Sequence, residues 1–256
     1  MTNILDGRSA LITGGYGGFG KACAIELARD GAAITLMGRK AASLEAAKAI
    51  ILAAVPSAKI ALVAGDATSE EDVAAAVAAS IAHGGGIDIV IPTVGGTSSL
   101  GPLVEHSYAG FMEDLRFNAG TAFLAVEKAV PHMKKGGSFV FISSNAAIMA
   151  FPNLAGYCAG KAALEHFVRS AANDLGARGI RLNCVRPGLT HTDGADAAFT
   201  DQAYIDRFVT RMPLGRAGVP LDIATAVRYL AGPESSWVTG QSFAIDGGHE
   251  LRGPTE

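Results

Sequence analysis

The sequence predicts an α/β fold, a doubly wound parallel sheet of about seven strands with helices on both faces. Short apolar runs alternate with longer Ala-rich segments along the 256 residues, which is the pattern of successive βα units. The short runs are apolar throughout, as expected for strands that are covered on both faces. No linker, repeat or low-complexity segment interrupts the pattern, so we expect a single domain over residues 1–256.

Length separates the two kinds of element, because runs of about four to eight apolar residues predict strands and segments of about ten or more predict helices. Strands are expected at residues 9–13, 33–37, 59–64, 87–92, 138–143, 181–185 and 242–245. Helices are expected at residues 19–30, 41–54, 70–83, 108–133, 156–178 and 221–231. One long irregular segment, about residues 189–213, includes a short helix candidate at 200–211. Such a segment inside a compact domain is often a lid over a substrate site.

The composition narrows the classes of partner. Lys and Arg number 21 and Asp and Glu number 24, so the net charge is −3, which argues against nucleic acid as a partner. The first residues lack the features of a signal peptide, and no run of about 18 apolar residues predicts a membrane span. Cys23, Cys158 and Cys184 are isolated, without metal-ligand spacing. We therefore expect a cytoplasmic protein that binds neither a membrane nor a metal.

A glycine-rich turn joins the first expected strand to the first expected helix. It reads Thr13-Gly14-Gly15-Tyr16-Gly17-Gly18-Phe19-Gly20. Glycines let a backbone turn tightly and approach a ligand, and the free N–H groups and dipole of a helix start attract phosphate. This context predicts a dinucleotide pyrophosphate site, with an ordinary tight turn as the alternative. The expected contacts are Gly14, Gly15, Tyr16, Gly18, Phe19 and Gly20.

The end of the second expected strand indicates which dinucleotide fits. An acidic residue there would bind a ribose 2′-OH, but the chain has Met37-Gly38-Arg39-Lys40. Arg39 and Lys40 favour a 2′-phosphate, hence NADP(H) over NAD(H), although they could also form a solvated helix start. Asp66, after the third expected strand, could accept a hydrogen bond from an adenine amino group or cap the following helix.

Tyr157 and Lys161 lie four residues apart, one helical turn, so both side chains can project from the same helix face. A phenol normally titrates near pH ~10, and a cation beside it favours the phenolate and lowers that pKa. The pair would make Tyr157 a proton donor or acceptor for a substrate oxygen. The same spacing occurs by chance on surface helices, so the surrounding motifs decide its meaning.

With these motifs in one order, the chain resembles the short-chain dehydrogenase/reductase family over about residues 7–248. The glycine turn matches the family's TGxxxGxG motif, and Tyr157–Lys161 matches its YxxxK motif. Ser144 lies thirteen residues before Tyr157, the usual spacing in the family, and Asn118 falls in the long helix where the family carries a fourth catalytic residue. Residues 181–188, 213–216 and 239–248 resemble the family's Pro-Gly segment and C-terminal region. The likeness is to its ketoreductase branch, which includes 3-oxoacyl-acyl-carrier-protein reductases.

The resemblance implies a Rossmann-type domain in which hydride passes between a nicotinamide and a carbonyl or alcohol carbon. Tyr157 would exchange the proton, and Lys161 would lower its pKa and hold the nicotinamide ribose. Ser144 would bind the carbonyl oxygen, and Asn118 would position a water that links Lys161 to solvent. Ser143 is the alternative serine, but neighbours on a strand point to opposite faces. Further cofactor contacts implied are Asp66, Ala67, Val94, Gly95, Tyr157, Lys161, Pro187, Gly188, Leu189, Thr190 and Thr192.

One segment departs from the family's pattern. After the fourth strand the family usually has Asn-Asn-Ala-Gly, whereas this chain reads Pro92-Thr93-Val94-Gly95-Gly96. Thr93 can replace only part of the asparagine hydrogen bonding, and Pro92 removes a backbone donor near a strand end. We therefore expect altered local sheet geometry and a reshaped pocket.

The expected substrate is a neutral, partly apolar ketone or secondary alcohol, because the segments that would line its pocket carry no compact cluster of cations. An acyl-carrier-protein substrate stays open, since Arg116, Arg169 and Arg178 could form a docking face or an ordinary solvated surface. The family commonly forms tetramers, so a homo-oligomer is implied. Two alternative functions remain, an NAD-dependent alcohol dehydrogenase working oxidatively and a catalytically silent nucleotide-binding protein. Arg39 argues against the first, and the complete catalytic set argues against the second.

Overall fold

The chain forms one sheet of parallel strands. The computed structural model describes residues 3–133, 136–192 and 201–252. Its sheet has seven strands in the order β3-β2-β1-β4-β5-β6-β7. The strands are β1 Ser9–Thr13, β2 Ala33–Gly38, β3 Ile60–Ala64, β4 Ile89–Pro92, β5 Ser138–Ile142, β6 Arg181–Pro187 and β7 Ser242–Ile245. The chain order reverses between β1 and β4, and open α/β sheets bind their ligands at such a reversal.

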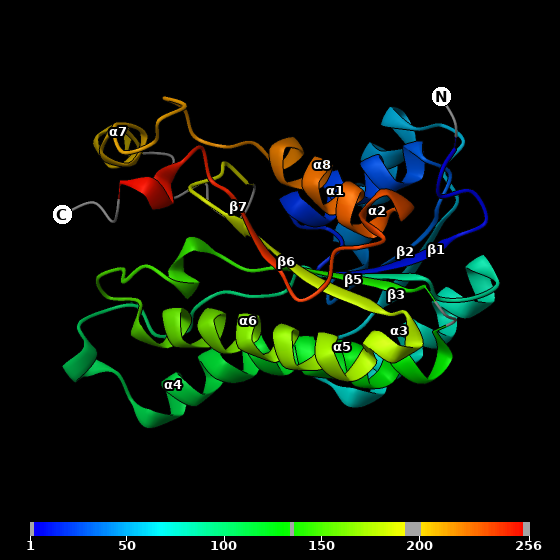
Figure 1. Cartoon of the computed structure of the whole chain (residues 1–256), viewed down its shortest axis with the longest axis horizontal. Helices are drawn as coiled ribbons and strands as arrows, with labels where there is room; N and C mark the ends of the chain where they lie inside the picture. Colours follow the sequence, from blue (N-terminus) through cyan, green and yellow to red (C-terminus); the bar gives the residue numbers. More distant parts are fainter. Residues whose placement is uncertain (1–2, 134–135, 193–200, 253–256) are drawn as a thin grey trace.

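Helices cover both faces of this sheet (Figure 1). One face carries α1 Gly18–Arg29, α2 Ala41–Ala54 and α8 Pro220–Ala231. The other carries α3 Glu70–Gly84, α5 Thr121–Ala129 and α6 Ala155–Leu175, with α4 Tyr108–Leu115 packed against α6. The helix α7 Gln202–Val209 lies apart from both layers, near the C-terminal segment. The predicted doubly wound α/β architecture is confirmed.

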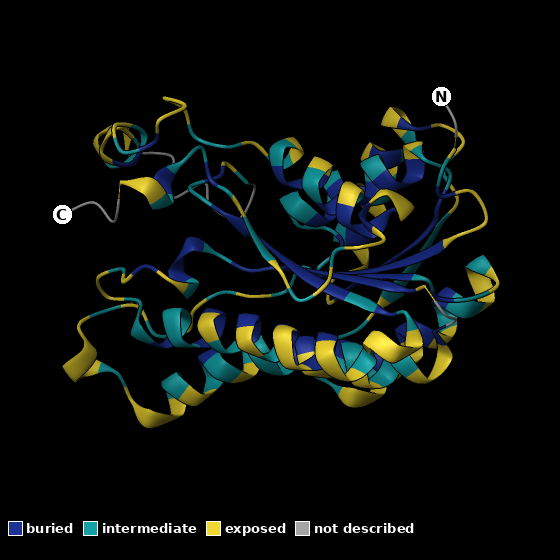
Figure 2. Ribbon diagram, in the orientation of Figure 1, coloured by how far each residue is buried: buried dark blue, intermediate teal, exposed yellow. Residues whose placement is uncertain are grey.

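Successive side chains of a strand enter opposite halves of the core. On β1, Ile12 belongs to the apolar cluster under α1, α2 and α8, whereas Leu11 belongs to the cluster under α3, α5 and α6. Figure 2 shows the strands as a buried layer between helices whose outer faces are exposed. The uninterrupted apolar runs in the sequence therefore reflect strands that are buried on both sides.

The helix expected at residues 108–133 is interrupted at its centre. The helix α4 leads into a π-helical turn, Arg116–Gly120, and α5 then continues to a 3₁₀ turn, Val130–His132. Apolar periodicity did not predict the interruption, because a wider turn changes the backbone hydrogen bonds without changing the composition. Such turns are uncommon and are frequent at functional sites. Asn118 lies in the middle of this one.

The segment after β4 that departs from the family's usual Asn-Asn-Ala-Gly changes the sheet less than expected. Pro92 still pairs with Thr13 of β1, and Thr93 donates its backbone N–H to the Thr13 carbonyl at 3.2 Å. The Thr93 hydroxyl donates to the same carbonyl at 2.8 Å. The pairing of β4 with β5 covers Ile89 and Val90 and stops ahead of Pro92. The β1 side of β4 is thus intact because Thr93 supplies two donors, and the shortened pairing lies on the β5 side.

The segment expected to be a lid contains α7, which is shorter than the helix predicted at 200–211. Phe208 of α7 packs against Phe151 and His249, with ring centres 6.3 and 5.6 Å away. These contacts join α7 to the segment after β5 and to the C-terminal segment. Residues 193–200 of the expected lid lie outside the described residues. No helix in the described ranges is both long and apolar enough to cross a membrane.

Candidate active site

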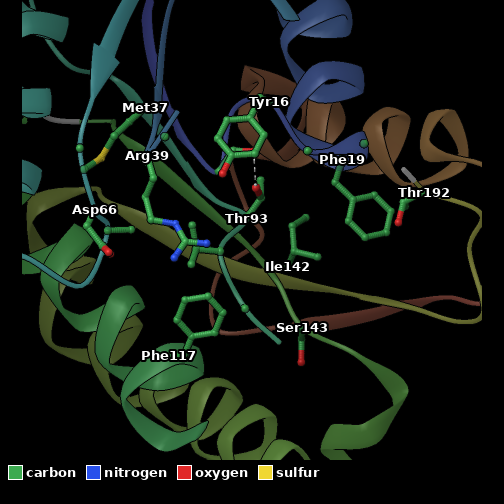
Figure 3. A pocket seen from close by; sticks show the side chains of 18 of the residues that line it. Tyr16, Phe19, Met37, Arg39, Asp66, Thr93, Phe117, Ile142, Ser143 and Thr192 are labelled. Carbon is green, nitrogen blue, oxygen red and sulfur yellow. Dashed lines mark hydrogen bonds between the residues drawn. The ribbon is translucent and has the colours of Figure 1, made fainter. Parts of the chain in front are cut away.

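A cavity of about 480 Å³ opens at the carboxyl ends of β1 and β4, where the strand order reverses (Figure 3). Three segments that are far apart in the sequence line it: the glycine turn, the end of β2 and the start of α6. The residues that were expected to hold a dinucleotide and that line this cavity are Gly14, Tyr16, Gly18, Phe19, Arg39, Asp66, Ala67, Val94, Gly95, Tyr157, Lys161 and Thr192.

The glycine turn leaves the start of α1 accessible to an anion. Gly14 has a φ of 69°, a backbone conformation that favours glycine. The helix begins after Gly17, and no side chain caps its first N–H groups. A Cβ on Gly18 would approach Thr192 Cβ to 2.9 Å, so this edge of the turn has no room for a larger residue. Uncapped N–H groups at the positive end of a helix dipole fit the pyrophosphate of a dinucleotide.

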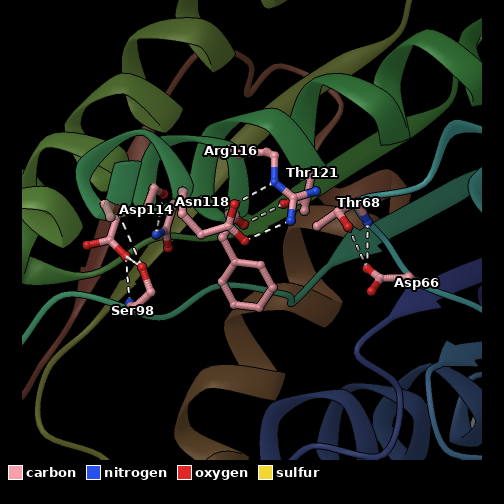
Figure 4. A network of polar contacts seen from close by, with 10 residues as sticks. Asp66, Thr68, Ser98, Asp114, Arg116, Asn118 and Thr121 are labelled. Carbon is pink, nitrogen blue, oxygen red and sulfur yellow. Dashed lines mark hydrogen bonds and ion pairs between the residues drawn. The ribbon is translucent and has the colours of Figure 1, made fainter. Parts of the chain in front are cut away.

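On the β2 and β3 side of the cavity, cations from two elements flank one carboxylate (Figures 3 and 4). Asp66 accepts hydrogen bonds from the backbone N–H and the hydroxyl of Thr68, at 2.9 and 2.8 Å. The Thr68 N–H holds the pKa of Asp66 below its usual value, and the charges of Arg39 and Arg116 lower it further. Ser69, not Asp66, caps α3. The helix-cap alternative for Asp66 is therefore wrong, and its contact with an adenine stays a prediction.

Tyr157 reaches the cavity from the first turn of α6. Its hydroxyl lies beside the side chain of Ser144, which follows β5. The side chain is half-buried as a whole, but burial of its hydroxyl raises the pKa of Tyr157, and the Ser144 contact only opposes this rise. The expectation that Lys161 lowers this pKa is not confirmed, because the loss of solvation dominates. Tyr157 therefore carries its proton near neutral pH.

Lys161 lies one turn along the same helix face, with Nζ 5.7 Å from the centre of the Tyr157 ring. Its ammonium donates a hydrogen bond to the Ile142 carbonyl at 2.8 Å. Burial lowers the pKa of Lys161 to about 8, because the ammonium has lost most of its solvent. The nearby Glu165 carboxylate opposes that shift. The predicted placement of Tyr157 and Lys161 on one helix face is confirmed.

The two neighbouring serines have different partners. Ser144 lies beside the Tyr157 hydroxyl and accepts a hydrogen bond from the Ala146 N–H at 3.2 Å. Ser143 is buried and donates its hydroxyl to Glu165 at 2.7 Å, and it lines the cavity, whereas Ser144 does not (Figure 3). The preference for Ser144 over Ser143 therefore stays a prediction, which rests on the position of Ser144 beside Tyr157 and on the engagement of the Ser143 hydroxyl by Glu165.

Asn118 lies in the π-turn and holds the backbone that follows β4 (Figure 4). Its side-chain amide donates to the Gly96 carbonyl at 2.7 Å and to the Asp114 carbonyl at 2.9 Å, and its oxygen accepts from the Gly96 N–H at 3.1 Å. A Cβ on Gly95 would lie 2.8 Å from Asn118 Oδ1 and 2.7 Å from Lys161 Nζ. Both polar atoms therefore approach the same side of Gly95, and glycine is the residue that leaves room for them.

Two glycines of α6 allow this helix to approach the π-turn closely. A Cβ on Gly160 would lie 3.0 Å from the Asp114 carbonyl, and one on Gly156 would overlap the Asp114 carboxylate. These glycines directly precede Lys161 and Tyr157. The close packing of α6 therefore places both side chains beside the strand ends that form the cavity.

Known proteins share this arrangement along nearly the whole chain. The family described as enoyl-(acyl carrier protein) reductase matches residues 15–250. An uncharacterized oxidoreductase of Mycobacterium tuberculosis is 36% identical over 247 residues, which cover 95% of this chain and 92% of that protein. Versicolorin reductase 1 of Aspergillus parasiticus is 34% identical over 257 residues, which cover 95% of this chain and 97% of that protein.

Solved structures agree with the sequence relatives. A short-chain type dehydrogenase/reductase from Mycobacterium ulcerans superposes with a TM-score of 0.93 at 31% identity, covering 98% of this chain and 92% of that one. The chain belongs to the short-chain dehydrogenase/reductase family. Levodione reductase superposes with a TM-score of 0.92 at 30% identity, and the alignment covers 96% of this chain and 98% of the levodione reductase chain. The short-chain dehydrogenase/reductase family consists of oxidoreductases that bind NAD(P), which agrees with the cavity at the glycine turn.

Several residues of this short-chain dehydrogenase/reductase that we expected to contact the cofactor do not line the cavity. A Cβ on Gly15 would lie 2.8 Å from Leu36 Cβ, and one on Gly20 would lie 2.5 Å from the Gly14 carbonyl. These two glycines are required by packing within the turn and against β2, not by room for a ligand. Lys40 begins α2 with an exposed side chain outside the cavity lining.

The Pro-Gly segment typical of the short-chain dehydrogenase/reductase family also lies away from the cavity. Pro187 ends β6, and a Cβ on Gly188 would lie 2.9 Å from the Asp246 Cα, so this glycine permits the close packing of β6 against the C-terminal segment. A second cavity, also of about 480 Å³, is lined by Leu189 and Thr190. Thr192 is the residue of this expected set that lines the first cavity.

Sequence reasoning missed three residues at this short-chain dehydrogenase/reductase site. Phe117 lines the cavity opposite Arg39 (Figure 3), and its position next to Asn118 was the available signal. Glu165 and Arg186 form a buried ion pair at 2.8 Å behind the site. The signal for Glu165 was its place one helical turn after Lys161. Within the described ranges, no group of His, Cys, Asp or Glu side chains could hold a metal ion.

Proposed function

We propose that this protein is an NADP(H)-dependent oxidoreductase that interconverts a ketone and a secondary alcohol, with Tyr157 exchanging the proton. One observation carries the proposal: the Tyr157 side chain, with Ser144 beside its hydroxyl, lines the same cavity as the uncapped start of α1. When bound there, the nicotinamide cofactor supplies or accepts the hydride. The chain supplies placement, charge and the proton.

The protonation states suit the reductive direction. Because its hydroxyl is buried, Tyr157 keeps its proton near neutral pH and can donate it to a carbonyl oxygen that becomes an alcohol. Ser144, beside the Tyr157 hydroxyl, can donate a hydrogen bond to the same oxygen. Lys161 is an ammonium below about pH 8 and stabilises the charge that Tyr157 gains once its proton has left. Asn118 Oδ1 and Lys161 Nζ, on one side of Gly95, can hold a water that returns a proton from solvent.

The residues around the cavity fit each part of the cofactor. The N–H groups at the start of α1 would bind the pyrophosphate, and Asp66 the adenine. Lys161 would also hold the nicotinamide ribose. Arg39 would bind the 2′-phosphate that distinguishes NADP(H), since it lines the cavity whereas Lys40 does not. The preference for NADP(H) therefore depends on Arg39.

The substrate we propose is a neutral, partly apolar ketone or alcohol. Phe151, Phe208 and Tyr204 form an aromatic cluster between the segment after β5 and α7. These segments are the ones that we expect to line the substrate pocket, and apolar rings there would favour a substrate without charge. Similar proteins named hydroxynaphthalene reductase-like protein, versicolorin reductase and levodione reductase are reductases by name.

We further propose a single domain whose lid, residues 189–213, closes over this substrate, in a cytoplasmic homo-oligomer. Phe123 of α5 is 52% exposed and packs on Phe167 of α6 with ring centres 6.0 Å apart. An exposed aromatic pair on the outer helices favours self-association, and the family resemblance favours a tetramer.

A screen for cofactor oxidation tests the proposed function. Purified protein is mixed with NADPH or NADH and a panel of ketones, β-ketoacyl thioesters, quinones and steroids, and in a parallel assay with NADP⁺ or NAD⁺ and secondary alcohols. We expect NADPH consumption with at least one neutral ketone, and slower consumption with NADH. Turnover confined to NAD⁺ and alcohols would favour an oxidative dehydrogenase. Cofactor binding without turnover on any compound would favour a silent nucleotide-binding protein.

A further inference from the structure

Behind Tyr157 and Lys161 lies a buried row of charges that the proposed reaction does not use. Glu165 follows Lys161 by one turn of α6, Arg186 is on β6, and Glu250 is in the C-terminal segment. Arg186 Nε donates to Glu165 Oε1 at 2.8 Å, and its NH1 donates to Glu250 Oε1 at 2.7 Å. Glu165 is 5% exposed and Arg186 is 8% exposed. Charges this deeply buried are unfavourable unless they are paired, as these are.

One carboxylate oxygen of Glu165 joins three elements of the site. Glu165 Oε1 accepts both the Arg186 Nε–H and the Ser143 hydroxyl, the latter at 2.7 Å. Ser143 directly precedes Ser144 after β5, Arg186 lies near the end of β6, and Glu165 shares α6 with Tyr157. The oxygen therefore fixes the ends of two strands to the helix that carries the proton donor.

Glu165 also lies close to Lys161, because the Lys161 ammonium bonds the Ile142 carbonyl and Glu165 bonds the hydroxyl of the next residue, Ser143. The titratable groups that act on Lys161 are Tyr157 and Glu165 on α6 and Cys184 on β6, and Arg186 acts on the same Cys184 thiol. Burial raises the pKa of the Cys184 thiol far above its usual value, so that thiol stays neutral, and Tyr157 is neutral as well. Arg186 is shared between two carboxylates, Glu165 and Glu250, so the row of three charges sums to −1.

We propose that Glu165 is a positioning residue that keeps the Lys161 ammonium charged beside Tyr157. The inference rests on the proposed function, in which a charged Lys161 supports proton transfer from Tyr157. A buried ammonium readily loses its proton unless an opposite charge replaces its lost hydration. Arg186 and Glu250 hold the Glu165 carboxylate in the position from which it acts. Glu165 touches neither substrate nor cofactor and acts through Lys161.

The pH profile of the Glu165→Gln variant tests this role. The amide keeps the size of the side chain and removes its charge, so Lys161 should lose its proton at a lower pH. We expect kcat/KM for NADPH-dependent ketone reduction to fall about fivefold at pH 8 relative to the unmodified protein, and by less than about twofold at pH 6. Glu165→Asp, which keeps the charge, should keep the original shape of the profile. Glu127→Gln makes the same chemical change at a half-exposed site on α5 and should leave the profile unaltered.

A uniform loss of kcat/KM across the pH range in Glu165→Gln would make the residue merely structural and overturn the inference. If that variant does not fold, Glu250→Gln at the outer end of the row changes the sum of the charges from −1 to zero and must show a selective loss at pH 8 in the same direction. The Tyr157→Phe variant distinguishes a failure of the proposed function from a failure of the inference about Glu165. If it reduces ketones as well as the unmodified protein, the proposed function fails. If it is inactive and the Gln profile is unchanged, only the inference about Glu165 fails.

Discussion

Burial sets the charge of the two residues at the centre of the site. Loss of solvent raises the pKa of Tyr157 and lowers that of Lys161 to about 8. Between neutral pH and pH 8, Tyr157 therefore keeps its proton while Lys161 still carries much of its charge. This combination suits donation of a proton to a carbonyl oxygen. A charged Lys161 beside the phenol would stabilise the phenolate that remains after the transfer.

Arg39 and Lys40 offer a matched test of the cofactor preference. Arg39→Asp should shift the preference toward NADH, because a carboxylate lining the cavity repels a 2′-phosphate and can bind a ribose 2′-OH. We expect the ratio of kcat/KM for NADPH to that for NADH to fall about a hundredfold, equivalent to roughly 2.7 kcal/mol. Lys40→Asp makes the same change of sign outside the cavity lining and should alter the ratio less than about tenfold. An unchanged ratio in Arg39→Asp, or equal effects of both substitutions, would reject the assignment.

Among the helices and strands, three local features bring distant segments to the cavity. The π-turn places Asn118 under the backbone after β4, where it holds Gly96 from both its N–H and its carbonyl. Gly156 and Gly160 let α6 lie directly against that turn. The Thr93 hydroxyl then ties the end of β4 to the end of β1, where the glycine turn begins.

Thr93→Val tests whether the hydrogen bond from the Thr93 hydroxyl stabilises the fold. Valine keeps the shape of threonine but removes the hydroxyl donor, which should lower the free energy of unfolding by about 1 kcal/mol. Thr93→Ser keeps the donor and should retain more of the stability. Unfolding by denaturant, followed for both variants, measures the difference. Valine and serine variants of equal stability would show that the hydroxyl contributes nothing.

The sequence predicted those features that depend on local pattern. The strand at Ser9–Thr13 has the predicted bounds, because a buried parallel strand is a short apolar run. The contact of Ser144 with Tyr157 followed from a motif spacing. The π-turn did not follow, since it is a choice of backbone hydrogen bonds that leaves the helical composition unchanged. The pairing of Glu165 with Arg186 across the sheet could not follow either, because it joins a helix and a strand through tertiary structure.

At the scale of the whole molecule, the reversal of strand order determines where the site lies. The glycine turn follows β1, Asn118 holds the segment after β4, and Ser144 follows β5, all at the same edge of the sheet. The two helical layers bury both faces of that sheet (Figure 1), so this edge is where a ligand can enter. The outer surface of the α5 and α6 layer carries the exposed Phe123.

The oligomeric state is a prediction about that surface. Light scattering should give the mass of four chains for the unmodified protein. Phe123→Glu should give a smaller mass, because a buried unpaired carboxylate is unfavourable at an apolar interface. Ile50→Glu, at a similarly exposed apolar residue of α2 on the opposite layer, serves as the control and should keep the mass. A monomeric unmodified protein, or an unchanged mass in Phe123→Glu, would contradict this prediction.

The most direct measurement of the central claim is single-turnover ketone reduction by Tyr157→Phe, with NADPH affinity measured separately. Phenylalanine keeps the ring that lines the cavity and removes the hydroxyl that we propose as the proton donor. We predict nearly unchanged NADPH affinity and a rate of ketone reduction about 100-fold to 10,000-fold lower than that of the unmodified protein. A Tyr157→Phe protein that binds NADPH and reduces the ketone at the unmodified rate would contradict the account.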